Sequence, residues 1–186
     1  MASELRTESI PAPLLIEEMK RAFRNERPDG ERPAGAPLGW VLTVPDTHQR
    51  SVLALLKDDP DIRLVTCSTE DEANAIAAGL WMGHEPVLLL IQHAGLYASV
   101  NTLRGVSMDG KVPVFYLVGL LGRRPGEDPA ESRSSMVRFA EPLLDTFDVP
   151  HSRLETRDDV GKIGELYALS RTRRGPTAAL VGLETS

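Results

Sequence analysis

Short apolar runs alternate with longer amphipathic segments along most of the chain. Runs of strand type lie at 39–44, 62–67, 87–91, 112–118, 149–154 and 177–183. Apolar residues at helical spacing predict helices over 14–24, 48–57, 70–82, 96–106, 134–146 and about 158–169. This alternation is typical of a parallel sheet with helices on both faces, so we expect an α/β fold with about six parallel strands.

The length of 186 residues fits one domain, and we take 1–186 as a single unit. Residues 1–13 are polar and are expected to be flexible. The segment 25–37 combines three prolines with two glycines, which indicates an inserted loop. A hydrophobic share of 41% is enough for a packed core, and with only 5% aromatic residues that core must consist mainly of Leu, Val, Ile and Ala.

Charge and composition exclude several classes of function. A net charge of −6 argues against a nucleic-acid partner bound through its phosphates. No apolar run reaches the roughly 18–20 residues of a membrane span, and the first residues lack the apolar core of a signal peptide, so we expect a cytoplasmic protein. The single cysteine, Cys67, excludes a disulfide framework, and four histidines without ligand spacing predict no metal site within this chain.

Polar groups follow two consecutive predicted strands. The strand 62–67 leads into Glu70-Asp71-Glu72, and the strand 87–91 leads into Gln92-His93-Ala94-Gly95. Carboxyl ends of parallel strands are the usual place for ligands in such folds. The acids could simply favour the start of a helix, or one of them could be desolvated and serve in proton transfer. Gly95 would let a ligand approach the backbone closely. The Gly-rich loops that bind nucleotides and the Gly-x-Ser-x-Gly hydrolase motif are absent.

Three motifs follow one another along the chain: Pro45-Asp46-Thr47, Glu70 nine residues before Gly79, and Gln92-His93-Ala94-Gly95-Leu96 with Ser99, Asn101 and Leu103. Together they resemble the pyrimidine-binding domain of thiamine-diphosphate enzymes, of the type found in sulfopyruvate and phosphonopyruvate decarboxylases. The likeness covers about 39–121. The third motif departs from the family pattern, because His93 replaces Asn, Ala94 replaces Ser, Tyr97 replaces Gly and Ala98 replaces Asn.

The resemblance implies a role for each matched residue. Glu70 would hydrogen-bond N1′ of the cofactor's aminopyrimidine ring and favour the tautomer that activates the thiazolium carbon for attack on a 2-oxo acid. Gln92 and Gly95 would line the cofactor site, and His93 could transfer protons because an imidazole titrates near neutrality. Asp46, Thr47 and Tyr97 would border the substrate. Glu72 is the fallback for Glu70.

The resemblance also implies a partner. Family members bind the diphosphate and Mg²⁺ through a Gly-Asp-Gly motif, which this chain lacks. We therefore expect the α subunit of a heteromeric, thiamine-diphosphate-dependent 2-oxo acid decarboxylase, active only with a β subunit that carries that motif. Two alternatives stay open: a subunit of a carboligase or aldehyde-forming synthase with the same cofactor, and a non-catalytic α/β partner subunit.

Overall fold

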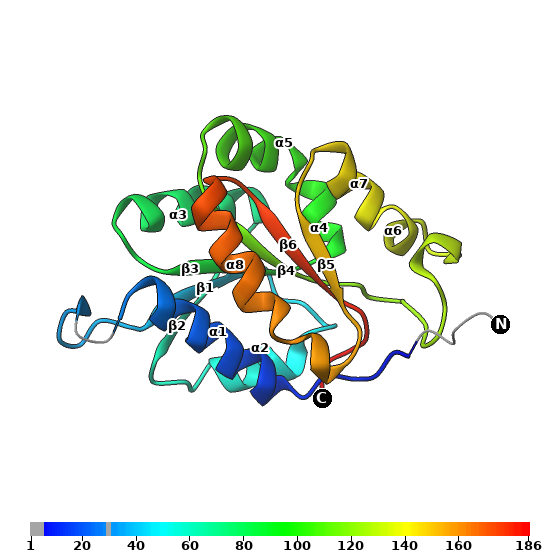
Figure 1. Cartoon of the computed structure of the whole chain (residues 1–186), viewed down its shortest axis with the longest axis horizontal. Coiled ribbons are helices and arrows are strands. Elements are labelled where there is room, and N and C mark those ends of the chain that lie inside the picture. The colour runs from blue at the N-terminus through cyan, green and yellow to red at the C-terminus, as the bar shows by residue number, and fades with distance from the viewer. Residues whose placement is uncertain (1–5, 29–30) are drawn as a thin grey trace.

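A parallel sheet of six strands forms the centre of the protein (Figure 1), as the sequence predicts. The computed structural model describes residues 6–28 and 31–186. The strands are β1 (Gly39–Thr43), β2 (Ile62–Thr66), β3 (Val87–Gln92), β4 (Phe115–Gly119), β5 (His151–Leu154) and β6 (Thr177–Val181). Their order in the sheet is β2-β1-β3-β4-β6-β5, and every neighbouring pair is parallel.

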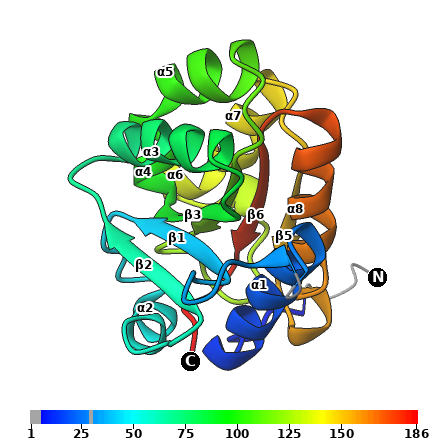
Figure 2. The same cartoon turned by 90° about the vertical axis from the view of Figure 1, so that its left-hand side faces the viewer.

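Helices cover both faces of this sheet, as Figure 2 shows most clearly. The longer ones are α1 (Ala12–Glu26), α2 (Arg50–Leu56), α3 (Glu70–Met82), α7 (Ala140–Thr146) and α8 (Lys162–Arg173). The other helical segments are α4 (His93–Ala98), α5 (Val100–Thr102), the π-helix η2 (Leu103–Asp109), the 3₁₀-helices η3 (Pro129–Glu131) and η4 (Arg157–Asp159), and α6 (Ser135–Arg138). Helices α1, α2 and α8 bury apolar residues on one face, and α3, α4, η2 and α7 do so on the other.

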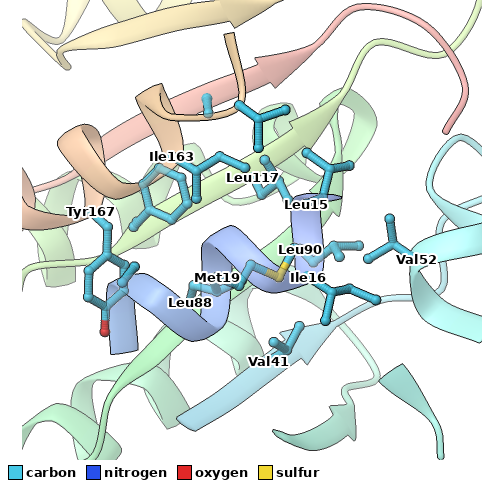
Figure 3. Close-up of a cluster of buried hydrophobic side chains, with 14 of the residues drawn as sticks. Leu15, Ile16, Met19, Val41, Val52, Leu88, Leu90, Leu117, Ile163 and Tyr167 are labelled. Carbon is cyan, nitrogen blue, oxygen red and sulfur yellow. The ribbon is translucent and has the colours of Figure 1, made fainter. Parts of the chain in front are cut away.

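The central strands supply residues to both cores because their side chains alternate in direction. Leu88 and Leu90 of β3 point toward the face covered by α1 and α8. There they belong to the same core as Met19 of α1 and Ile163 and Tyr167 of α8 (Figure 3). Leu89 and Ile91 belong to the core under α3 and α4. A strand that is buried on both sides reads as a continuous apolar run, which is why its position is predicted correctly from the sequence.

Two predicted helices are divided into shorter segments in the structure. The helix expected at 96–106 begins at His93 and continues as α4, α5 and η2 to Asp109. No turn residues separate it from β3, since Gln92 is both the last strand residue and the N-cap of α4. The helix expected over 134–146 is divided at Phe139, because Pro142 has no N–H with which to continue α6 and is instead accommodated in the first turn of α7.

The structure describes only part of the two segments that the sequence predicts to be irregular, 1–13 and 25–37. Helix α1 continues two residues further than predicted, to Glu26, so it overlaps the start of the expected loop 25–37; residues 29–30 of that loop lie outside the described part. Residues 1–5 of the expected flexible segment also lie outside it. Among residues 6–13, the amide of Glu8 donates to the carbonyl of Glu155 at 2.7 Å, and Ile10 is buried.

The neighbouring strands β1 and β3 form a topological switch point of the sheet. The chain leaves β1 toward α2 on one face, whereas it leaves the adjacent β3 toward α4 on the other. Loops that diverge in this way open a space at the carboxyl ends of the two strands, and α/β sheets bind ligands at such a point. The residues after β1 and β3 are therefore the first place to look for a site.

Candidate functional site

Asp46 connects the end of β3 with the segment that leads from β1 to α2. It is only 3% exposed and lies between β1 and α2. Its Oδ1 accepts hydrogen bonds from the backbone amide of His48 at 2.8 Å and from Nε2 of Gln92 at 2.9 Å, and its Oδ2 accepts from Nε2 of Gln49 at 3.2 Å. A buried carboxylate requires such donors, so Asp46 fixes the end of β3 relative to the start of α2. The predicted neighbours Asp46 and Gln92 are thus in direct contact.

Two buried histidines flank this carboxylate. Nε2 of His48 bonds to the carbonyl of Val181 at 3.0 Å, and Nε2 of His93 bonds to the carbonyl of Leu121 at 2.9 Å. A carbonyl oxygen can only accept, so each ring carries its hydrogen on Nε2. Burial lowers the pKa of both imidazoles, although their carbonyl partners and the nearby charge of Asp46 act to raise it. Both rings are therefore neutral near pH 7.

Three acceptors in this cluster have no hydrogen-bond donor among the residues that the structure describes. They are Nδ1 of His48, Nδ1 of His93 and Oε1 of Gln49, all buried. Gln49 uses its amide N–H groups on Asp46 and on the carbonyls of Ile91 and Leu117. Buried acceptors normally find a donor, so this end of the sheet can receive one from a water or a ligand.

The sequence reasoning missed His48 and Gln49. Both were placed in the predicted helix 48–57 without a function. A signal was present, because they precede the inward-facing Val52 by four and three residues, which puts them on the same side of a helix as Val52. Polar residues at inward-facing positions indicate a buried polar cluster, but the spacing of the histidines does not indicate that His48 and His93 are neighbours.

The three acidic residues at the start of α3, Glu70-Asp71-Glu72, make different contacts. Glu72 completes the N-terminal cap: its Oε2 accepts from the amide of Ser68 at 2.6 Å, while its own amide donates to Oγ1 of Thr69 at 3.2 Å. Asp71 accepts from the hydroxyl of Thr102 at 2.7 Å and so joins α3 to α5. Within the described residues, the carboxylate of Glu70 accepts no hydrogen bond.

The half-buried side chain of Glu70 lies directly over the backbone of Gly95. A β-carbon built on Gly95 would be 2.2 Å from Oε1 of Glu70 and 2.5 Å from its Cγ and Cδ. Contacts this short do not occur between a real β-carbon and its neighbours, so only glycine permits the approach. The structure therefore brings Glu70 and Gly95 together from α3 and α4, and it leaves the carboxylate free to accept from a bound group.

The remaining predicted residues lie around these contacts. Tyr97 donates its hydroxyl to the carbonyl of Met136 at 2.9 Å, which ties α4 to α6. Thr47 is exposed and lines a surface depression of about 420 Å³ together with Asp46 and Arg50.

In the part of the chain that the structure describes, no three His, Cys, Asp or Glu side chains are placed to hold a metal ion. None of the described helices combines the length and the apolar character needed to cross a membrane.

Comparisons with known proteins bear on the whole arrangement. The alpha subunit of sulfopyruvate decarboxylase from Methanococcus maripaludis is 27% identical over 143 residues, which cover 76% of this chain and 84% of that subunit. The corresponding subunit from Methanocaldococcus jannaschii is 24% identical over 68% of this chain and 73% of its own length. The chain is a homologue of sulfopyruvate decarboxylase alpha subunits.

A second group of homologues consists of longer proteins. Phosphonopyruvate decarboxylase from Streptomyces viridochromogenes is 30% identical over 127 residues, which cover 68% of this chain but only 32% of that enzyme. No family model matches the sequence. The resemblance that the three motifs indicate is thus confirmed at the level of homology, and the chain spans most of the alpha subunits but about a third of the phosphonopyruvate enzyme.

Proposed function

We propose that this chain is the pyrimidine-binding subunit of a thiamine-diphosphate-dependent 2-oxo acid decarboxylase. The observation that carries the proposal is the carboxylate of Glu70, which lies against Gly95 at the carboxyl edge of the sheet and has no hydrogen-bond donor among residues 6–28 and 31–186. A homologue of decarboxylase alpha subunits with such a carboxylate is well suited to accept a hydrogen bond from a protonated ring nitrogen.

The contacts around Glu70 support its role as the acceptor for an aminopyrimidine ring. The absence of a side chain at Gly95 lets the Glu70 carboxylate lie against the backbone of α4, while the other two acids of the cluster accept hydrogen bonds from Ser68 and Thr102. Of the two candidate acids, the structure thus favours Glu70 over the fallback Glu72, whose carboxylate completes the helix cap. When bound, thiamine diphosphate would supply the carbon nucleophile and the electron sink for loss of carbon dioxide.

The other residues position groups and handle protons in this proposal. Gln92 is held by Asp46 and keeps the first turn of α4 in place beneath the cofactor site. His93 is neutral, and its free Nδ1 can accept a proton from a reacting group and return it later. Thr47 and Tyr97 are assigned to the substrate in this proposal, and Thr47 lines the same surface depression as Arg50, whose exposed cation suits an anionic substrate.

The proposal includes a partner subunit, because this sequence lacks the motif that binds the diphosphate in the family it resembles. The sequence contains no Gly-Asp-Gly motif with which to bind the diphosphate and Mg²⁺. The homologous phosphonopyruvate decarboxylase devotes only a third of its length to the region that matches this chain, and the other homologues are named as alpha subunits. We therefore propose a hetero-oligomer in which the partner holds the diphosphate and Mg²⁺, and in which this chain alone is inactive.

The experiment compares two glutamates of the same cluster in the complex of this chain with its partner. Release of carbon dioxide from sulfopyruvate and phosphonopyruvate is measured with thiamine diphosphate and Mg²⁺, and cofactor binding is followed separately by calorimetry. Glu70→Gln is expected to reduce turnover by about 10²–10⁴-fold, because proton transfer to the ring is lost. Glu72→Gln, the matched control, is expected to retain turnover and lose about 1 kcal/mol of stability as a weakened cap.

Two results would contradict the proposal. Full turnover by the isolated chain would exclude a site shared with a partner. Equal activities of the Glu70→Gln and wild-type complexes would remove the residue on which the assignment depends. Product analysis distinguishes the alternative, because a carboligase would release a carbon–carbon coupled product in place of the free aldehyde.

A further inference from the structure

Helix α3 contains one buried polar side chain among small apolar residues. Its buried residues are Ala73, Asn74 and Ala77, and Asn74 is 0% exposed. Asparagine is a poor helix former, and an amide buried in a core requires partners. The function proposed above assigns no role to Asn74, so its presence one turn after Glu70 requires an explanation.

The amide of Asn74 joins three elements. Its Nδ2 donates to the backbone carbonyl of Glu70 at 3.0 Å. Its Oδ1 accepts from the hydroxyl of Tyr116 in β4, and the hydroxyl of Ser107 lies 3.0 Å from that of Tyr116 and 3.5 Å from the same Oδ1. Burial raises the pKa of Tyr116, so its hydroxyl stays protonated and remains a donor throughout the working pH range.

The π-helix η2 brings Ser107 into this group. Ser107 is fully buried and lies within the seven residues of η2, which pack against α3. The wider turn of a π-helix changes the direction of the side chains that follow, and such segments are frequent near functional sites. The hydroxyls from η2 and from the centre of the sheet thus converge on one amide of α3.

Small residues alone would hold α3 only loosely in register. Alanine side chains offer no directional contact, yet a catalytic carboxylate has to stay within about 0.5 Å of its productive position. The hydrogen bonds of Asn74 are directional, and they connect the first turn of α3 to a tyrosine in the most buried part of the sheet.

We infer that Asn74, held by Tyr116 and Ser107, is a positioning residue that sets the place of Glu70. The inference rests on the proposed function of Glu70. It makes Asn74 a determinant of turnover although its side chain reaches neither the cofactor nor the substrate.

The test uses three variants of decreasing severity in the reconstituted complex: Asn74→Ala, Tyr116→Phe and Ser107→Ala. Asn74→Ala and Tyr116→Phe are expected to lower kcat by about 10-fold or more, because a small misplacement of a catalytic group is costly, while KM for the 2-oxo acid stays unchanged. Hydrogen exchange of the full-length chain is expected to be faster at the first-turn amides of α3 in both variants. Ser107→Ala, which leaves the Tyr116–Asn74 bond, is expected to show a smaller effect in the same direction.

Tyr167→Phe is the matched control. Tyr167 is also a buried tyrosine with a hydrogen-bonded hydroxyl, but it lies in α8 on the opposite face, where it contacts Glu26 and Arg171. The inference is overturned if the Tyr116→Phe and Tyr167→Phe variants lose the same amount of folding stability and their complexes also have the same kcat. The Tyr116 hydroxyl would then have no effect on turnover beyond its effect on stability. If Glu70→Gln itself leaves turnover unchanged, the proposed function fails first, and this inference fails with it.

Discussion

Replacement of Gly95 by alanine tests whether the place of the Glu70 carboxylate governs activity. The added methyl group would lie 2.2 Å from Oε1 of Glu70. Carbon and oxygen atoms that are not bonded need well over 3 Å, so the carboxylate has to retreat by about 1 Å. The end of a glutamate side chain is flexible and half-buried here, so it can move without disturbing the core.

The consequence for activity should exceed the consequence for stability. A misplacement of about 1 Å can cost on the order of 100-fold in rate, which corresponds to about 2.7 kcal/mol in the barrier. Stability should change by less than about 1 kcal/mol, because an alanine is favourable in a helix and offsets part of the displacement. Gly95→Ala is therefore expected to fold normally and to turn over poorly.

The assay measures kcat of the complex with sulfopyruvate alongside urea unfolding of the chain. Gly161→Ala is the control: the backbone of Gly161 is helical, and a β-carbon there meets nothing within 4 Å. It should leave both quantities almost unchanged. A Gly95→Ala complex with wild-type kcat would show that Glu70 does not act from the observed position, and a large loss of stability would show that its side chain cannot yield.

Further predictions concern the buried charged and titratable groups. The pKa of His48 and His93 is lower in the folded chain than the roughly 6.5 of the unfolded one, so the unfolded state binds more protons as the pH falls below about 7. Stability should then decrease by up to about 1.4 kcal/mol per pH unit for each histidine, and His93→Asn should flatten this slope in urea unfolding at pH 5–7.5. Arg123, whose side chain is 0% exposed, pairs with Glu155 at 2.8 Å; Arg123→Met should cost about 3–5 kcal/mol, most of which Arg123→Met/Glu155→Leu should restore.

Each of these has a result that contradicts it. An unchanged pH slope in His93→Asn would mean that the ring is not kept neutral by burial. A double variant as unstable as Arg123→Met would mean that the guanidinium contributes through packing and not through its charge. Both measurements require only this chain and denaturant titrations.

Local sequence patterns determined the order of elements and the residues at the carboxyl edge. The central strands were predictable because burial on both faces demands continuous apolar runs, as in β3. The shared location of Glu70 and Gly95 was also predictable, because both follow strands of a parallel sheet and such strands end at the same edge. The split at Pro142 was in principle readable from its missing N–H, whereas the start of α4 at His93 had no local marker.

Only the tertiary structure decided which polar groups share an environment. His48 and His93 are 45 positions apart, yet both rings lie near Asp46 and both are neutral because the sheet and its loops exclude water from them. Spacing to Gly79 favours Glu70 over Glu72, but only the fold shows how their surroundings differ: the Glu72 carboxylate accepts from the amide of Ser68, whereas the Glu70 side chain lies over Gly95. Hydrogen bonding and close approach depend on distance through space, which spacing along the chain does not specify.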